Sequence, residues 1–293
     1  MSVSFLIGVD GGGTGTRARL CGADGRPLAQ GEAGPSGLMH GIDQAWRQVL
    51  QAVAAAFDRA GMNPPAWADC ALAAGLAGVN DPTQAAAFIA ANPGFRPLLL
   101  DTDSFTAVVG AHAGRPGLVL IAGTGSVAEA WYANGSRRIA GGWGFPVGDE
   151  GSGAWLGLQA VRLAQQALDG RATRGPLADA VCAATGRDAD TMLAWCAQAN
   201  QTRYASLAPL VFEHEATDPR AASLLRSAVD ALAELAHALD PTGALPVVCS
   251  GSIARRLQPR LPAALRARCT EAAGDAADGA LHLLRQRLAA EAE

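Results

Sequence analysis

The chain has 293 residues, of which 49% are hydrophobic and 17% are charged, and its formal net charge is −4. This composition indicates a globular protein long enough for two domains, and it favours neither nucleic acid nor a membrane as a partner. The sequence shows no basic N-terminal signal and no apolar stretch of membrane-spanning length, and its six cysteines are widely spaced. We therefore expect a cytoplasmic protein with reduced thiols and without a zinc or iron–sulfur site.

The first hundred residues predict strands that alternate with helices. An apolar strand at 5–9 enters a glycine-rich turn, and residues 16–21 alternate as a second strand, so the glycines close a β-hairpin. The following βαβ units complete a mixed sheet with helices on its faces. The further elements are a strand near Leu28, a helix at about 43–60, a strand at 69–75, a helix that starts at Asp81-Pro82, a strand at 97–100 and a helix through Val108 and His112.

The same order of elements begins again after a break at 114–117, which indicates a domain boundary. The repetition predicts an internal duplication of one fold. The second set consists of strands at 118–121 and 127–132, a hairpin turn at Asn134-Gly135, a strand through Ile139, a glycine-rich loop at 141–153, helices over 154–239, and a strand at 246–249 that ends in a small-residue turn at 250–252.

Two glycine turns, 8–16 and 121–126, follow apolar runs that are typical of buried strands. Such turns allow backbone N–H groups to surround phosphate, and Asp10 could hold a Mg²⁺ ion bound to the same phosphates. All 23 basic residues are arginine, and the absence of lysine argues against a P-loop, a lysine Schiff base and a protein-kinase fold. A dinucleotide-binding turn would open a helix rather than a hairpin. A glycine-rich hairpin can also be no more than a tight turn.

The order of several motifs carries a family resemblance. The motifs are Asp10-Gly-Gly-Gly-Thr14, Asp103, Gly123-Thr-Gly-Ser126, Gly141-Gly-Trp-Gly144, Gly148-Asp-Glu-Gly-Ser152 and Gly251-Ser252. Over nearly its whole length the chain resembles the N-acetylglucosamine kinase and bacterial glucosamine kinase branch of the BadF/BadG/BcrA/BcrD ATPase family. The resemblance implies an α/β fold of two ribonuclease-H-like (actin-like) domains with a central cleft. We place the N-terminal domain at 1–113, joined by a C-terminal helix at about 276–293, and the C-terminal domain at 114–275.

The resemblance also implies an ATP-dependent, Mg²⁺-assisted kinase that phosphorylates the 6-hydroxyl of N-acetylglucosamine or glucosamine, with a homodimer as a candidate assembly. Asp103 matches the family's catalytic base, which orients the acceptor hydroxyl and takes its proton. Asp10 would position Mg²⁺ through water. ATP would contact Gly11, Gly12, Gly13, Thr14, Gly123, Thr124, Gly125, Gly251 and Ser252, and the sugar would contact Gly37, Asp103, Gly125, Gly142 and Asp149.

Other roles stay open for some of these residues. Asp103 could be only a helix N-cap, and Asp101 is a less favoured candidate for the base. Asp149 could cap the helix that follows it, and Glu150 could take its place at the sugar. We expect Trp143 to pack under the glycine-rich loop rather than to form a platform for the sugar.

Two departures from the family concern the sugar. Gly37 stands where the family usually has an asparagine, and Ala77 stands where the animal enzymes have a serine.

Two other functions are alternatives to the kinase. One is an ATPase that activates a partner enzyme, against which the scattered cysteines argue. The other is a catalytically silent sugar sensor, against which the intact Asp10 and Asp103 argue.

Overall fold

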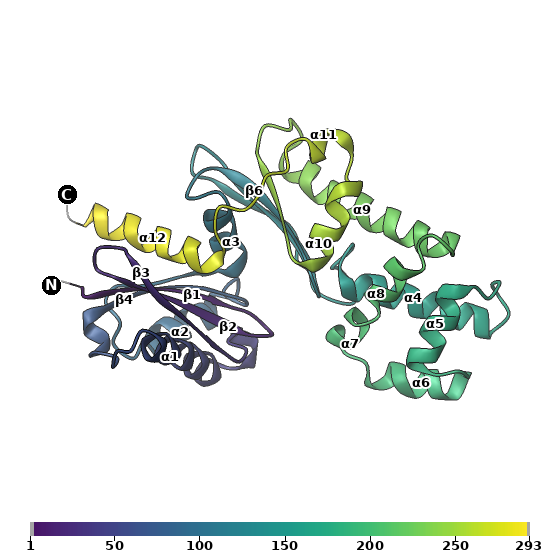
Figure 1. Ribbon diagram of the computed structural model, residues 1–293, viewed down its shortest axis with the longest axis horizontal. Coiled ribbons are helices and arrows are strands. Elements are labelled where there is room, and N and C mark those ends of the chain that lie inside the picture. Colours follow the sequence, from purple (N-terminus) through teal and green to yellow (C-terminus); the bar gives the residue numbers. More distant parts are fainter. Residues whose placement is uncertain (1–2, 292–293) are drawn as a thin grey trace. The chain divides into compact units, whose positions relative to one another are not determined.

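The computed structural model describes residues 3–291, and the chain divides into two compact units (Figure 1). Of the described residues, the first unit contains 3–117, the segment Trp131–Ser136 and 271–291. The second contains Leu118–Ala130 and Arg137–Thr270. Trp131 groups with the first unit because its ring packs edge-on against Phe105, with the ring centroids 5.8 Å apart. The domain limits expected from the sequence stay a prediction.

A five-stranded sheet forms the centre of the first unit, with β1 (Phe5–Gly11), β2 (Thr16–Gly22), β3 (Pro27–Ala33), β4 (Cys70–Leu76) and β5 (Leu98–Thr102) in the spatial order β3-β2-β1-β4-β5. The first three strands are antiparallel and joined by tight turns. The last two run parallel, β4 beside β1 and β5 beside β4. The predicted hairpin and mixed sheet are confirmed.

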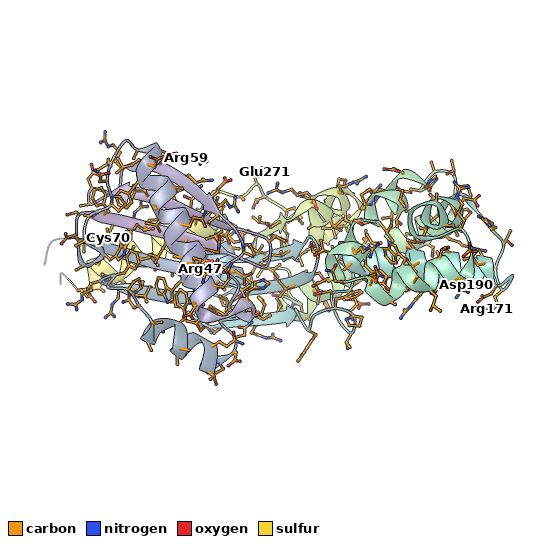
Figure 2. All side chains as sticks on the ribbon, turned by 90° about the horizontal axis from the view of Figure 1, so that it is seen from below. Arg47, Arg59, Cys70, Arg171, Asp190 and Glu271 are labelled. Carbon is orange, nitrogen blue, oxygen red and sulfur yellow. The ribbon has the colours of Figure 1, made fainter. Side chains whose placement is uncertain are left out.

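One face of this sheet is covered by α1 (Ile42–Arg59), whose apolar side is buried and whose outer side carries Arg47 and Arg59 (Figure 2). The two layers approach closely, because a Cβ added at Gly31 would lie 2.0 Å from the carbonyl oxygen of Ala52. The other short elements of the unit are the 3-10 turns η1 (Leu38–His40) and η2 (Trp67–Asp69) and the helices α2 (Pro82–Ala90) and α3 (Asp103–Ala111).

The opposite face is covered by the C-terminal helix α12 (Ala276–Ala290) (Figure 1). Side chains alternate along β1, so Ile7 and Val9 point to α1 while Leu6 joins the cluster beneath α12. Leu281 is buried in that cluster, and such burial of a leucine stabilises a fold by about 1.5 to 3 kcal/mol. The last helix of the chain is thus part of the first unit.

The second unit is built on a four-stranded sheet, with β6 (Gly117–Ala122), β7 (Ser126–Trp131), β8 (Arg137–Gly141) and β9 (Val247–Ser250) in the order β8-β7-β6-β9. This repeats the order β3-β2-β1-β4, with β9 parallel to β6 as β4 is parallel to β1, and it agrees with the expected duplication. The helices are α4 (Gly153–Leu168), α5 (Pro176–Thr185), α6 (Ala189–Gln198), α7 (Gln201–Ala205), α8 (Ala208–Glu213), α9 (Pro219–Leu239), α10 (Ser252–Leu257) and α11 (Ala263–Arg266), with η3 at Gln258–Arg260.

All six cysteines are free thiols. Burial raises the pKa of Cys70 to about 11 and that of Cys249 to about 12, so both thiols stay protonated and unreactive at neutral pH. Between residues 3 and 291, no helix has the length and apolar character that a membrane crossing requires.

Candidate active site

The turn between β1 and β2 is open on its outer side. Gly11 is enclosed, because a Cβ there would lie 2.0 Å from Ser36 Oγ. Gly12 and Gly13 differ, since a Cβ on either would meet no atom of the described residues within 4 Å. Open glycines beside an exposed threonine hydroxyl are suited to holding phosphate. The turn borders a cavity of about 470 Å³ lined by Asp10, Gly12, Thr14, Gly15, Thr16, Arg17, Glu32 and Ala33.

The segment after β3 is fastened to this turn. The backbone N–H groups of Ser36 and Gly37 both donate to the carbonyl oxygen of Gly12, over 3.2 and 3.1 Å. The Thr16 hydroxyl lies 2.7 Å from Ser36 Oγ and 2.6 Å from the carbonyl oxygen of Gly34. Gly37, a predicted sugar residue, is therefore held beside the predicted phosphate turn. Ser36 is fully buried and anchors this arrangement, and no motif in the sequence marks it.

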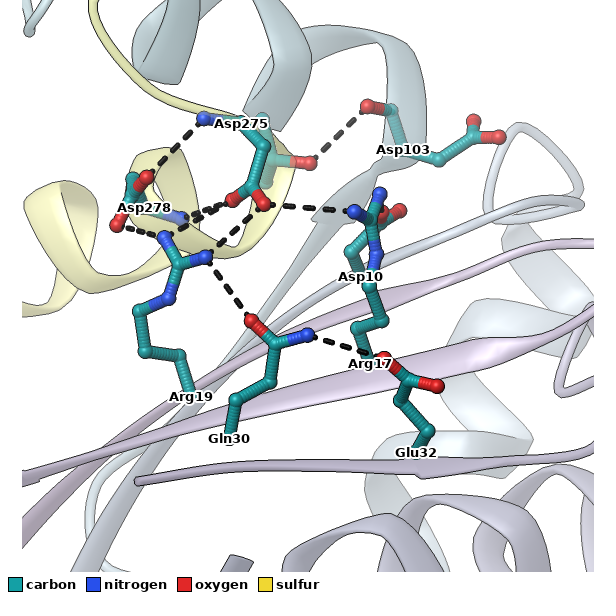
Figure 3. Close-up of polar contacts among 9 residues, drawn as sticks. Asp10, Arg17, Arg19, Gln30, Glu32, Asp103, Asp275 and Asp278 are labelled. Carbon is teal, nitrogen blue, oxygen red and sulfur yellow. Dashed lines mark hydrogen bonds and ion pairs between the residues drawn. The ribbon is translucent and has the colours of Figure 1, made fainter. Parts of the chain in front are cut away.

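Asp10 lies at the end of β1 and forms an ion pair with Arg17 (Figure 3). The two residues are cross-strand partners in the hairpin, and Arg17 Nη2 lies 2.7 Å from Asp10 Oδ2. Burial raises the pKa of the Asp10 carboxyl, while the hydrogen bond from Arg17 opposes this rise. From the sequence alone, Arg17 is only one residue of the alternating strand predicted at 16–21. The hairpin register is the signal that places it opposite Asp10.

The described residues contain no cluster of three or more His, Cys, Asp or Glu side chains that could hold a metal ion. Asp10 lies at a strand end, lines the polar cavity of the first turn and has Arg17 as its partner. Such a donor fits Mg²⁺, which usually keeps several water ligands and binds through one or two carboxylates and the phosphates of a substrate.

Asp103 is the first residue of α3, directly after β5. The N-cap is Thr102, whose Oγ1 accepts a hydrogen bond from the Phe105 N–H at 3.1 Å, so the interpretation of Asp103 as an N-cap is wrong. Asp103 instead accepts from the Ser104 N–H at 2.9 Å. Burial raises the pKa of its carboxyl, the Ser104 N–H opposes the rise, and the charge of Asp10 adds to it.

The strand register explains why these carboxylates lie at one edge of the sheet. Gly75 of β4 pairs with Asp10 of β1 on one side and with Asp101 of β5 on the other. Parallel strands present their carboxyl ends at the same edge, so Asp103 follows at this edge too (Figure 3). Asp101, the alternative base, accepts the Thr102 N–H at 2.8 Å.

The second glycine turn, between β6 and β7, is tied to its neighbours through the backbone. The Gly123 N–H donates to the Gly125 carbonyl oxygen at 2.9 Å, and the Gly123 carbonyl oxygen accepts from the Gly153 N–H at the start of α4. Gly251 has a φ of 90°, and a Cβ there would lie 2.4 Å from the Ala122 carbonyl oxygen. The turn before α10, which ends in the exposed Ser252, is therefore adjacent to the second glycine turn.

Asp149 is buried, with 5% of its surface exposed, and has a positive φ of 63°. Its Oδ1 accepts from the Ser126 N–H at 3.1 Å, and its Oδ2 accepts from Gln201 Nε2 at 2.8 Å. The expectation that it could cap the next helix is wrong, because Ser152 caps α4. Burial raises the pKa of its carboxyl, the Ser126 N–H opposes this, and Glu150 adds to it.

Asp149 borders Gly125 directly and is connected to Gly142 through Ser126. A Cβ added at Gly125 would lie 2.9 Å from Asp149 Oδ2. The Gly142 N–H donates to the Ser126 carbonyl oxygen at 3.1 Å, next to the N–H that binds Asp149. Gln201 comes from α7, far along the chain, and no motif in the sequence marks it. The competing residue Glu150 is exposed.

The expectation for Trp143 is wrong. Its side chain is 84% exposed, so it does not pack under the glycine-rich loop. The backbone around it is left-handed at Gly141, Gly142 and Gly144, which have φ values of 74°, 71° and 85° and are suited to glycine. Val147 in the same loop is 87% exposed.

The two departures from the family lie together in the first unit. A Cβ added at Gly37 would lie 3.6 Å from the Cβ of Ala77 and 2.4 Å from Met39 Sδ. The Leu38 N–H donates to the Ala77 carbonyl oxygen at 2.8 Å and keeps the two segments adjacent. Gly37 and Ala77 therefore form one small apolar spot.

The chain is similar to several known proteins. Glucosamine kinase GspK of Vibrio cholerae is 32% identical over 280 residues, which cover 95% of each chain. An N-acetylmuramic acid/N-acetylglucosamine kinase of Clostridium acetobutylicum is 28% identical over 173 residues, 58% of this chain and 56% of that protein. A crystal structure from Chromobacterium violaceum, proposed to be an N-acetylglucosamine kinase, matches with a TM-score of 0.93 and 47% identity, covering 97% of this chain and 100% of that one.

The two mixed sheets and the structural match confirm the predicted α/β class with two ribonuclease-H-like (actin-like) units. The family model of the BadF/BadG/BcrA/BcrD ATPases matches residues 7–271. Since this match covers most of the sequence, the chain belongs to the BadF/BadG/BcrA/BcrD ATPase family.

Proposed function

We propose that the chain is an ATP-dependent amino-sugar kinase, which transfers the γ-phosphate of ATP to the 6-hydroxyl of N-acetylglucosamine or glucosamine. The observation that carries the proposal is the pair Asp10 and Asp103 at one edge of the first sheet, beside an open glycine turn. The names of the similar proteins, all amino-sugar kinases or proposed ones, support the substrate class.

Asp103 is the proposed catalytic base. Phosphoryl transfer needs a group that orients the acceptor hydroxyl and takes its proton as the phosphoryl group arrives. One carboxylate oxygen of Asp103 accepts the Ser104 N–H, which orients the carboxyl group. A pKa raised by burial makes the carboxylate a stronger proton acceptor than an exposed one.

Asp10 is the proposed anchor for Mg²⁺, through water. The ion would neutralise charge on the transferred phosphoryl group. For ATP we propose contacts with the open first turn and the backbone of the second and third turns. These residues are Gly11, Gly12, Gly13, Thr14, Gly123, Thr124, Gly125, Gly251 and Ser252.

The proposed sugar residue with the strongest structural support is Asp149. Its carboxylate already accepts hydrogen bonds from a backbone N–H and an amide, and a carboxylate has lone pairs left for sugar hydroxyls. Gly125 and Gly142 would present backbone groups next to it. Gly37 and Asp103 are the proposed sugar residues of the first unit.

The test measures ADP release with ATP and Mg²⁺ in the presence of glucosamine, N-acetylglucosamine, glucose or no sugar. A kinase releases ADP with an amino sugar and yields its 6-phosphate, and the 6-deoxy analogue of that sugar gives no product. ADP release without any sugar would favour an ATPase that activates a partner. Sugar binding without ADP release would favour a sensor.

A further inference from the structure

Arg17 bridges the phosphate turn and the start of the last helix (Figure 3). One guanidinium nitrogen lies 2.7 Å from Asp10 Oδ2, and another lies 3.5 Å from Oδ2 of Asp275. Asp275 is separated from Arg17 by most of the chain, so the folding of α12 onto the sheet creates this contact. Asp10, Arg17 and Asp275 thus form a continuous chain of alternating charges.

Asp275 is held firmly in its place. It is the N-cap of α12 and forms a capping box with Asp278, whose N–H donates to Asp275 Oδ1 at 3.1 Å. Arg19 also binds its carboxylate, at 3.1 Å. The backbone is equally confined, because a Cβ at Gly110 of α3 would lie 1.8 Å from the Asp275 carbonyl oxygen. These contacts therefore hold the carboxylate of Asp275 in one position beside the phosphate turn.

Arg17 differs from its neighbour Arg19 in what else it faces. The Arg17 side chain is 46% exposed and lines the cavity at the first glycine turn together with Gly12 and Thr14. A guanidinium group has five N–H donors in a fork that matches phosphate, so two carboxylate contacts leave donors unused. Arg19 is only 22% exposed and binds Asp275 and Asp278.

We propose that Asp275 is a positioning residue of the nucleotide site, which holds Arg17 at the turn so that Arg17 exchanges Asp10 for a phosphate oxygen. The inference rests on the proposed function, since it takes the nucleotide as the ligand of this turn. The exchange leaves the Asp10 carboxylate without its arginine partner. The cap of the last helix is in this way coupled to nucleotide binding.

The first measurement is calorimetric binding of ADP and ATP, with and without Mg²⁺, in the absence of sugar. We expect Arg17→Gln to weaken binding about tenfold or more, because a charged hydrogen bond to phosphate is lost. Arg17→Lys should fall between it and the wild type. Asp275→Asn should weaken binding by a few-fold, since asparagine keeps the helix cap but loses the charge that holds Arg17.

The double variant Arg17→Gln/Asp275→Asn shows whether the two substitutions weaken nucleotide binding through the same contact or independently. If Asp275 acts through Arg17, the double variant binds nucleotide no more weakly than Arg17→Gln alone. Fully additive losses would overturn the proposal.

The matched control is Asp278→Asn in the same turn of α12. It removes a carboxylate that binds Arg19, so it should lower the melting temperature while the nucleotide Kd stays unchanged. Arg47→Gln, on the outer side of α1, controls for the loss of one positive charge (Figure 2).

Two further results would overturn the inference: unchanged Kd values for Arg17→Gln and Asp275→Asn, or an equal loss in Asp278→Asn. Failure of the proposed function has a different signature, because the wild type would then bind nucleotide without phosphorylating any amino sugar.

Discussion

The two glycine turns occupy equivalent places in the two sheets but have different chemical surroundings. The first turn borders a cavity and the ion pair of Asp10 with Arg17, in which Arg17 is the more exposed partner. The second borders Asp149, a buried carboxylate that accepts from the Ser126 N–H and the Gln201 amide. A partly exposed ion pair at an open turn suits a charged ligand, whereas a buried carboxylate held by neutral donors suits hydroxyl groups. A similar turn sequence can therefore serve two tasks, because the side chains around it differ.

The largest expected effect is at the edge of the first sheet. Asp103→Asn should lower kcat by about 10² to 10⁴, the usual contribution of a general base, with ATP and sugar Kd nearly unchanged. Steady-state kinetics and calorimetry measure the two quantities. Asp101→Asn is the matched control, since it removes a carboxylate of β5, two residues before Asp103 begins α3. Turnover within a few-fold of wild type for Asp103→Asn would assign the base to another residue.

The second turn should respond more strongly to steric change than the first responds to loss of a hydroxyl. Gly125→Val places atoms where a Cβ would already lie 2.9 Å from the Asp149 carboxylate. We expect kcat/KM for both ATP and sugar to fall by more than about tenfold, since displaced polar groups lose their alignment. Kinetics with each substrate varied in turn would test this, and unchanged values would contradict the role of Gly125.

In the first turn, Thr14→Val removes the hydroxyl but keeps the shape of the side chain. We expect the KM for ATP to rise by roughly tenfold, the effect of one lost hydrogen bond to a charged group. Thr14→Ser, which keeps the hydroxyl, should stay near the wild type. An unchanged KM for ATP and an unchanged kcat in Thr14→Val would mean that this hydroxyl does not contact phosphate.

Gly37→Asn tests the apolar spot that Gly37 forms with Ala77. The new side chain must displace the tip of Met39, which is flexible and 59% exposed, so the fold should tolerate it. If the added amide forms a hydrogen bond with the sugar, the kcat/KM values for glucosamine, N-acetylglucosamine and glucose should change relative to one another by about tenfold. Gly37→Ala adds a Cβ without a hydrogen-bonding group and is the control. A strong wild-type preference that Gly37→Asn leaves unaltered would assign recognition to other residues.

The smallest expected effect concerns stability and pH at Asp149. Burial raises the pKa of Asp149 in the folded protein above its value in the unfolded chain. The protonated carboxyl therefore adds to the free energy of unfolding at pH values below the unfolded pKa, and this contribution is lost as the pH rises through the folded pKa. The asparagine side chain of Asp149→Asn stays neutral at every pH. As the pH rises from the unfolded to the folded pKa of Asp149, the variant should therefore become more stable relative to the wild type. Urea unfolding at several pH values measures the difference, and the exposed Asp190→Asn is the control (Figure 2). A difference that does not vary with pH would contradict the raised pKa.

The strands, the main helices and the glycine turns could be predicted from the sequence because they depend on local patterns. Apolar runs and alternation locate β1 to β5, and Asp81-Pro82 marks the start of α2 through a cap that the structure contains. The cap of α3 is less certain in sequence, since Thr102 and Asp103 are both capable residues and only the backbone geometry chooses Thr102.

The environments of the candidate site residues depend on contacts between distant segments. Arg17 meets Asp275 because α12 folds back onto β1, and Asp149 meets Gln201 because α7 lies near the second turn. Trp143 differs from these residues because it lies among glycines with positive φ and its large apolar side chain is exposed rather than packed against a distant segment. The sequence by itself determined which residue types stand at which turns, since strand periodicity and glycine content are local. Only the tertiary structure decided the partners of each charge, since ion pairing and burial depend on which segments pack together.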